Sequence, residues 1–162
     1  MTSKRILSVT VANKPGVLSR ITGLFSRRNY NINSLNVGET ENPEYSRMTI
    51  VVDADDRTLE QIKSQLDKLV EVIQITELDR TNIVDRDLAL IRVNSSRNQR
   101  SEIIQIVDTF RARIVDLSTD TIMIEATGTP SKIEALIDIL KDFGIIDIVR
   151  TGLVALNRGV VE

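Results

Sequence analysis

The segment N-K-P-G-V-L at residues 13–18 separates two patterned stretches of the chain. Alternating apolar residues at 6–12 predict a short strand, and apolar residues at helical spacing predict an amphipathic helix over about 17–28. Between them, Pro15 fixes its own φ and has no N–H, while Gly16 allows a close backbone approach. The segment therefore predicts a tight strand-to-helix turn, which we call the corner.

The corner has two interpretations that its own residues leave open. In the first it is only a turn, in which Asn13 caps the helix and Pro15 and Gly16 shape the bend. In the second it is a site for one carboxylate, formed at the positive end of the helix dipole by the amides of Gly16, Val17 and Leu18. Asn13 would then add an amide donor and a carbonyl acceptor.

The rest of the first half alternates between strand and helix patterns. Three further strands are predicted, at residues 32–38, 47–53 and 70–78. A second helix is predicted after Asp55 or Asp56, either of which can cap it, from apolar residues at positions 59, 62, 66 and 69. The order is therefore βαββαβ, the ferredoxin-like arrangement.

A polar segment at 79–85 is interpreted as a linker, after which the same pattern returns. Helices are predicted at 103–110 and from the Thr129-Pro130 pair to Gly144. Strands are predicted at 88–93, 114–117, 121–126 and 145–156, with Gly152 as the point where the last one can break. We therefore expect an α+β protein with two ferredoxin-like βαββαβ domains in tandem, at residues 1–78 and 86–162.

The size of these domains favours self-association. Each half has only about 75 residues, near the size at which a single core is marginal. An open four-stranded sheet also leaves edge strands whose amides are unpaired. Both properties lead us to expect a homodimer that forms through the first domain.

Composition excludes several kinds of chemistry. The sequence contains no Cys, His or Trp, which removes thiol and imidazole nucleophiles, the usual zinc sites and any disulfide. The net charge of −2, with acids and bases interspersed, gives no basic field for nucleic acid. No apolar run approaches the ~20 residues that span a bilayer, and M-T-S-K-R lacks the apolar region of a secretory signal. We expect a soluble, cytoplasmic protein.

Two clusters of charged residues have ordinary explanations. Asp53, Asp55 and Asp56 could offer oxygen ligands, but the spacing of a calcium loop is missing and acids are expected before a helix. The run S-S-R-N-Q-R at 95–100 resembles an anion-binding loop, but it lacks the glycines of a phosphate loop. No metal site and no catalytic residue are predicted.

Five segments carry a resemblance to a known family. They are I-L-S-V (6–9), N-K-P-G-V-L-S-R-I (13–21), G-L-F-S-R-R-N-Y-N-I (23–32), S-R-M-T-I (46–50) and G-L-V-A-L-N-R-G (152–159). With these segments the first half resembles the ACT domain, a regulatory module that binds small molecules, and the chain more closely resembles the small, regulatory subunit of acetohydroxyacid synthase (acetolactate synthase). That family also continues into a second ferredoxin-like domain, so the resemblance covers nearly the full chain.

One position departs from the family pattern. Many relatives have Gly before the Tyr-Asn-Ile run, where this chain has Asn29. Asn tolerates a left-handed backbone better than most residues, so we expect the turn to be preserved.

The resemblance implies a regulatory role. The family's small subunit binds the catalytic subunit, which depends on thiamine diphosphate, raises its activity and confers feedback inhibition by valine or another branched-chain amino acid. Thiamine diphosphate, Mg²⁺ and FAD belong to the catalytic subunit in that family. The resemblance therefore implies that this chain holds no cofactor or metal.

The resemblance also implies a binding pocket between two ACT domains. A free amino acid needs a carboxylate site, an acceptor for its ammonium group and an apolar wall. The implied pocket residues are Asn13, Gly16, Val17 and Leu18 of one chain and the partner's Asn31 and Ile32. A separate hypothesis assigns Arg47 and the exposed part of the second strand to docking on the catalytic subunit.

The sequence is also compatible with two other functions. The chain could be an ACT-type amino-acid sensor that regulates a different enzyme or a transcription factor, and co-purification with a large thiamine-dependent subunit separates these cases. An independent small enzyme is disfavoured by the missing His, Cys and phosphate loop. The sequence does not choose among valine, leucine and isoleucine, since one methylene is worth only ~1–3 kcal/mol in an apolar pocket.

Overall fold

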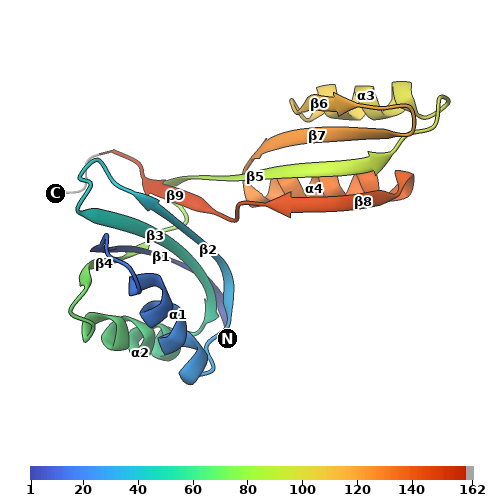
Figure 1. Cartoon of the computed structure of the whole chain (residues 1–162). Helices are drawn as coiled ribbons and strands as arrows, with labels where there is room; N and C mark the ends of the chain where they lie inside the picture. The colour runs from blue at the N-terminus through green and yellow to red at the C-terminus, as the bar shows by residue number, and fades with distance from the viewer. Residues whose placement is uncertain (160–162) are drawn as a thin grey trace. The chain divides into compact units, whose positions relative to one another are not determined.

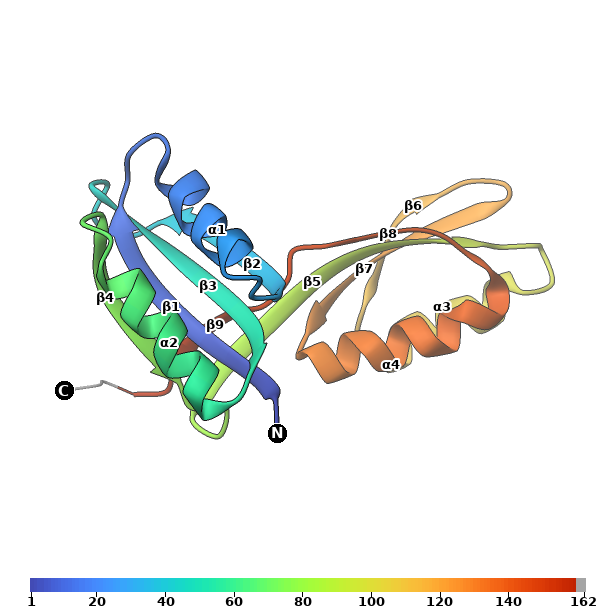
Figure 2. The same ribbon diagram turned by 90° about the horizontal axis from the view of Figure 1, so that it is seen from below.

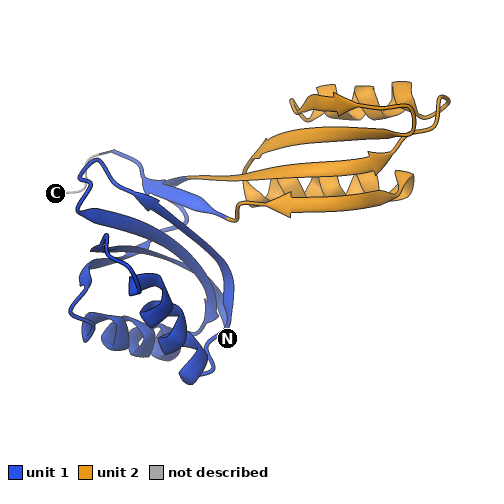
Figure 3. Cartoon of the chain, viewed as in Figure 1, with its two compact units in different colours: residues 1–84, 153–162 blue, residues 85–152 orange. Residues whose placement is uncertain are grey.

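The computed structural model describes residues 1–159, and the expectations for residues 160–162 lie outside this range. The chain forms two compact units, coloured separately in Figure 3. Unit 1 comprises Met1–Val84 and the segment from Leu153 onward, and unit 2 comprises Asp85–Gly152. Unit 1 is therefore discontinuous in sequence.

Unit 1 has the predicted βαββαβ order (Figure 1). Its sheet has the strand order β2-β3-β1-β4, and each pair of neighbouring strands is antiparallel. The elements are β1 (Ser3–Ala12), α1 (Val17–Arg27), β2 (Ile32–Glu39), β3 (Tyr45–Ala54), α2 (Asp56–Asp67) and β4 (Val72–Leu78), followed after unit 2 by β9 (Val154–Asn157).

The alternation of side chains along β1 and β3 separates the two faces of this sheet. The inner face packs against α1 and α2 through Leu7, Val9, Val11, Met48, Ile50 and Val52. These six side chains are at most 1% exposed. Figure 1 shows both helices on this one face of the sheet.

The outer face of the same sheet is partly covered by the C-terminal segment. Leu153 is buried there with Ile6, Val51, Leu78 and Ile83, and Ala155 packs against this cluster. We expected residues after 86 to belong to the second domain, whereas the structure groups residues 153–159 with unit 1. The physical reason is this apolar cluster, which joins residues far apart in sequence.

Unit 2 repeats the same architecture. Its sheet has the strand order β6-β7-β5-β8, and Figure 2 shows its two α-helices on one face. The elements are β5 (Ile83–Asn94), which begins in unit 1, α3 (Arg100–Thr109), β6 (Arg113–Leu117), β7 (Thr121–Gly128), α4 (Pro130–Leu140), a short 3₁₀ helix (Lys141–Phe143) and β8 (Ile145–Arg150). The break expected at Gly152 is confirmed, since its φ is 82° and β9 begins only at Val154.

The linker expected at 79–85 is shorter than predicted, because β5 already begins at Ile83. Asp87 is a charged residue within this strand, and it is only 4% exposed. Its carboxylate accepts a hydrogen bond from Arg150 Nε at 2.9 Å. Among residues 1–159, no helix combines the length and the apolar character needed to cross a membrane.

Candidate functional site

The corner forms a tight turn that leads directly into α1. Gly16 precedes the helix with φ 86° and ψ −10°, and the Val17 amide donates to the Lys14 carbonyl at 3.4 Å. With Pro15 before it, Gly16 fits the third position of a type II turn, which requires positive φ. Gly16 is therefore the N-cap residue, and the interpretation in which Asn13 caps the helix is wrong.

Two of the three corner amides remain available. The amides of Gly16 and Leu18 donate to no acceptor within residues 1–159, while that of Val17 is used in the turn. A Cβ added to Gly16 would meet no atom within 4 Å, so the space beside it is open. Two free N–H groups at the positive end of a helix dipole are suited to binding a carboxylate.

Asn13 connects the corner to the hairpin between β2 and β3. Its Nδ2 donates to Glu39 Oε1 at 3.2 Å and to the Pro43 carbonyl at 3.0 Å. Its backbone N–H donates to the Glu44 carbonyl at 2.8 Å. Its Oδ1 accepts no hydrogen bond from the described residues, which leaves an acceptor for an ammonium group.

Glu39 is a polar neighbour of the corner that the sequence analysis does not identify. It lies 26 residues from Asn13, so no local pattern connects the two. The available signal is topological. In the strand order β2-β3-β1-β4, Ala12 pairs with Tyr45, which places the β2–β3 hairpin beside the end of β1.

The two apolar residues of the corner differ in exposure. Leu18 is 43% exposed and can offer an apolar wall to a ligand. Val17 is only 5% exposed and packs in the core of unit 1. Because its amide is also engaged, Val17 contributes to the corner by fixing the start of α1 rather than by offering a free group.

Asn31 and Ile32 lie beyond the other end of α1. The helix has 11 residues, which corresponds to a length of about 16 Å. Ile32 is half-buried against the core, and Asn31 is exposed. Within one chain the structure therefore does not bring these two residues to the corner. The expected left-handed turn before them is confirmed, with φ 58° at Asn29.

Arg47 lies on the outer face of the unit 1 sheet. In the strand register it stands between Thr10 of β1 and Gly38 of β2. It lines two hollows beside β9.

The three aspartates considered as metal ligands each have a separate partner. Asp53 accepts from Asn33 Nδ2 at 2.8 Å, and Asp55 accepts from the Thr58 amide at 2.7 Å as the N-cap of α2. Asp56 pairs with Arg5 at 2.8 Å. No group of three or more acidic side chains in the described part of the chain is arranged to hold a metal ion.

The S-S-R-N-Q-R run forms the turn that enters α3. The Ser96 carbonyl accepts hydrogen bonds from the amides of Gln99 and Arg100, each at 3.1 Å. Arg100 Nη2 donates to the carbonyls of Ser118 and Thr119, each at 2.9 Å. Arg100 therefore links the β6–β7 hairpin to the start of α3 through these hydrogen bonds.

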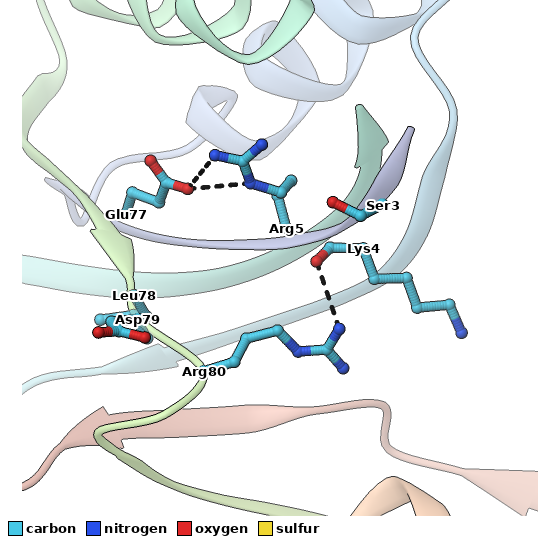
Figure 4. A pocket seen from close by; sticks show the side chains of 7 residues that line it. All are labelled: Ser3, Lys4, Arg5, Glu77, Leu78, Asp79 and Arg80. Carbon is cyan, nitrogen blue, oxygen red and sulfur yellow. Dashed lines mark hydrogen bonds and ion pairs between the residues drawn. The ribbon is translucent and has the colours of Figure 1, made fainter. Parts of the chain in front are cut away.

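A further hollow of about 440 Å³ lies where β1 begins and β4 ends (Figure 4). Its central cation is compensated, since Arg5 donates to Glu77 and to Asp56. These hydrogen bonds, the one to Asp56 first, raise the pKa of the Arg5 guanidinium above its ordinary value. Arg80 reaches the Lys4 carbonyl at 3.5 Å. The Arg5 guanidinium is therefore already paired within the chain.

Comparison with known families gives matches over both units. A model described as the AHAS small subunit-like ACT domain matches residues 7–74. A model described as the small subunit of acetolactate synthase matches residues 86–159.

Individual relatives agree with these matches. The acetolactate synthase small subunit of Mycolicibacterium smegmatis is 52% identical over 158 residues, covering 98% of this chain and 93% of that protein. That of Bacillus subtilis is 48% identical, covering 96% and 91%. The crystal structure of the acetolactate synthase small subunit from Thermotoga maritima has a TM-score of 0.91 and 45% identity, covering 98% of this chain and 99% of that one.

Proposed function

The chain belongs to the family of acetolactate synthase small subunits, and from this premise we propose that it regulates the catalytic subunit of that enzyme. In this role it binds the thiamine-diphosphate-dependent catalytic subunit, raises its activity and confers feedback inhibition by valine or another branched-chain amino acid. The chain itself is non-catalytic. Thiamine diphosphate, Mg²⁺ and FAD bind to the catalytic subunit alone.

The observation that carries this proposal is the open corner at the start of α1. The ligand carboxylate binds to the free amides of Gly16 and Leu18. The ammonium group binds to Asn13 Oδ1, close to the carboxylate of Glu39. The aliphatic side chain packs against Leu18.

A second copy of the chain completes this pocket. Burying a valine side chain is worth roughly 1.5–3 kcal/mol, and a ligand with so few atoms must bury nearly all of them to bind usefully. The corner of one chain is too open for that, as shown by the exposure of Leu18. In the proposed homodimer the partner's Asn31 and Ile32 close the pocket over the ligand.

A pocket shared between chains also accounts for regulation. A ligand changes the activity of a partner only if it binds one arrangement of the subunits better than another. A site whose two halves come from different chains responds directly to how those chains are arranged. Feedback inhibition then follows from the preference of the ligand for the less active arrangement.

The test compares Gly16→Asp with Gly16→Asn in the holoenzyme. Both side chains enter open space and both residue types tolerate positive φ better than most, so the two variants differ mainly in charge. The added carboxylate of Gly16→Asp occupies the site of the ligand carboxylate. We expect the valine concentration for half-inhibition to rise at least ~10-fold, a loss of about 1.4 kcal/mol in binding.

Gly16→Asn serves as the control for bulk and backbone strain. It is expected to retain more of the inhibition than Gly16→Asp, and both variants should still activate the catalytic subunit. Normal inhibition of Gly16→Asp by valine, leucine and isoleucine would remove the corner from the ligand site. Failure of the unmodified chain to bind the catalytic subunit would contradict the regulatory function itself.

A further inference from the structure

The outer face of the unit 1 sheet carries a groove that the corner does not use. Two adjoining hollows, of about 260 and 270 Å³, are both lined by Arg47 of β3 and Ala155 of β9. Gly38, Glu39 and Thr49 line the second of them. We call this region, defined by these five residues, the Arg47 groove.

Arg47 has no directly paired carboxylate in this groove. Within residues 1–159 its guanidinium forms no ion pair, whereas Arg5 and Arg20 of the same unit are both paired. The Arg47 Nε is buried and has no hydrogen-bond acceptor. The two Nη groups of Arg47 are not among the buried atoms, and a carboxylate can accept two parallel hydrogen bonds from the terminal groups of a planar guanidinium.

Glu39 lies in the same groove but forms no ion pair with Arg47. Glu39 is the one acidic residue among the described residues that line the two hollows. Its carboxylate accepts the hydrogen bond from Asn13 instead. The formal charges of the lining residues therefore balance, but Glu39 forms no ion pair with Arg47, and the guanidinium has no direct carboxylate partner among the described residues.

Access to Arg47 is kept open by the residue opposite it. Gly38 pairs directly with Arg47 in the β2–β3 register, so both lie on the same face of the sheet. A Cβ added to Gly38 would meet no atom within 4 Å. A larger side chain at this position would enter the hollow that Gly38 and Arg47 both line.

We propose that the Arg47 groove receives an acidic side chain of the catalytic subunit and thereby contributes to assembly of the holoenzyme. This inference rests on the proposed function, which supplies the partner. A carboxylate carried on a protein surface is favoured over a free molecule for a physical reason. The hollows are open to solvent, so a molecule with few atoms would stay largely hydrated and bind weakly, whereas a protein side chain brings neighbouring contacts with it.

The test measures the dissociation constant between the purified chain and the catalytic subunit. Arg47→Gln removes the charged guanidinium and leaves a shorter polar side chain, and Gly38→Val places a side chain in the groove while the arginine stays in place. We expect each to weaken binding by ~10- to 100-fold, the range for losing one charge-assisted contact. Arg57→Gln, at an exposed position on α2 and so on the opposite face, should bind within about twofold of the unmodified chain.

Salt dependence and ligand binding separate the outcomes. The affinity of the unmodified chain should fall with rising salt more steeply than that of Arg47→Gln. Calorimetric binding of branched-chain amino acids to Arg47→Gln should be unchanged, because the corner is intact. Unchanged assembly of both groove variants, alongside normal assembly of the unmodified chain, would overturn the inference and leave the proposed function standing. If both groove variants bind the catalytic subunit normally and the unmodified chain binds acetate saturably at Arg47, the groove is instead a site for a free carboxylate.

Discussion

At the scale of single residues, Asp55 links local sequence to pH-dependent stability. Its carboxylate caps α2 by accepting the Thr58 amide at 2.7 Å, and this hydrogen bond lowers the pKa of Asp55. A carboxyl group with a lowered pKa in the folded state stabilises the fold above its unfolded pKa of about 4 and loses that effect as the pH falls further. Asp55→Ala should therefore lower the melting temperature by a few degrees at pH 7, with a smaller difference from the unmodified chain below about pH 4.

Asp67→Ala provides the matched control, because Asp67 ends the same helix. A carboxylate near the negative end of the helix dipole is unfavourable, so its removal should be neutral or slightly stabilising at pH 7. Thermal unfolding monitored by circular dichroism from pH 3 to pH 8 measures both variants. If Asp55→Ala lowers the melting temperature equally at pH 3 and at pH 7, the charge of the carboxylate does not contribute to stability.

Single residues also show what the sequence could predict about the site. Positive φ at Gly16 and Asn29 could be predicted, because it follows from local turn chemistry. The role of Asn13 could not, because its amide is held by Glu39 and Pro43 of a distant hairpin. The local sequence alone predicted a capping role, because it contains no information about contacts with that hairpin.

At the scale of elements, apolar periodicity located the four α-helices and most strands, since each has one buried face. It failed where a polar residue is buried by pairing. Asp87 interrupts the apolar alternation of β5, and the Arg150 that compensates its charge follows 63 residues later. The strand therefore looked shorter than it is.

The packing of β9 on unit 1 is a further property of elements, and Leu153 tests it. This side chain is 7% exposed within a small apolar cluster, whereas Leu156 in the same segment is 61% exposed. Leu153→Ala should destabilise unit 1 by about 2–3 kcal/mol, the low end for a buried leucine. Leu156→Ala should change stability by less than ~0.5 kcal/mol. Urea unfolding measures both, and equal effects would show that the cluster does not hold β9.

At the scale of the whole molecule, the two ends of α1 limit where the ligand site can form. The corner lies at the start of α1, and Asn31 follows the end of that helix, about 16 Å away along its axis. A single chain cannot close the proposed pocket with both groups. A site that uses both must take its two halves from two chains, and this requirement can be tested by mixing variants.

Gly16→Asp alters the corner, and Asn31→Asp alters the residue beyond the far end of α1. The homodimer of either variant should lose most of its inhibition by valine. A mixed dimer isolated through two different affinity tags carries both lesions in one pocket and none in the other. If the pocket is shared between chains, the mixed dimer should regain up to about half of the normal inhibition, because one of two equivalent sites is intact. Pairing Gly16→Asp with Leu18→Asp places one lesion in each pocket and should restore nothing. Equal inhibition of the two mixed dimers by valine would mean that each chain binds its ligand alone. Only a pocket shared between chains makes the pairing of Gly16→Asp with Asn31→Asp differ from its pairing with Leu18→Asp.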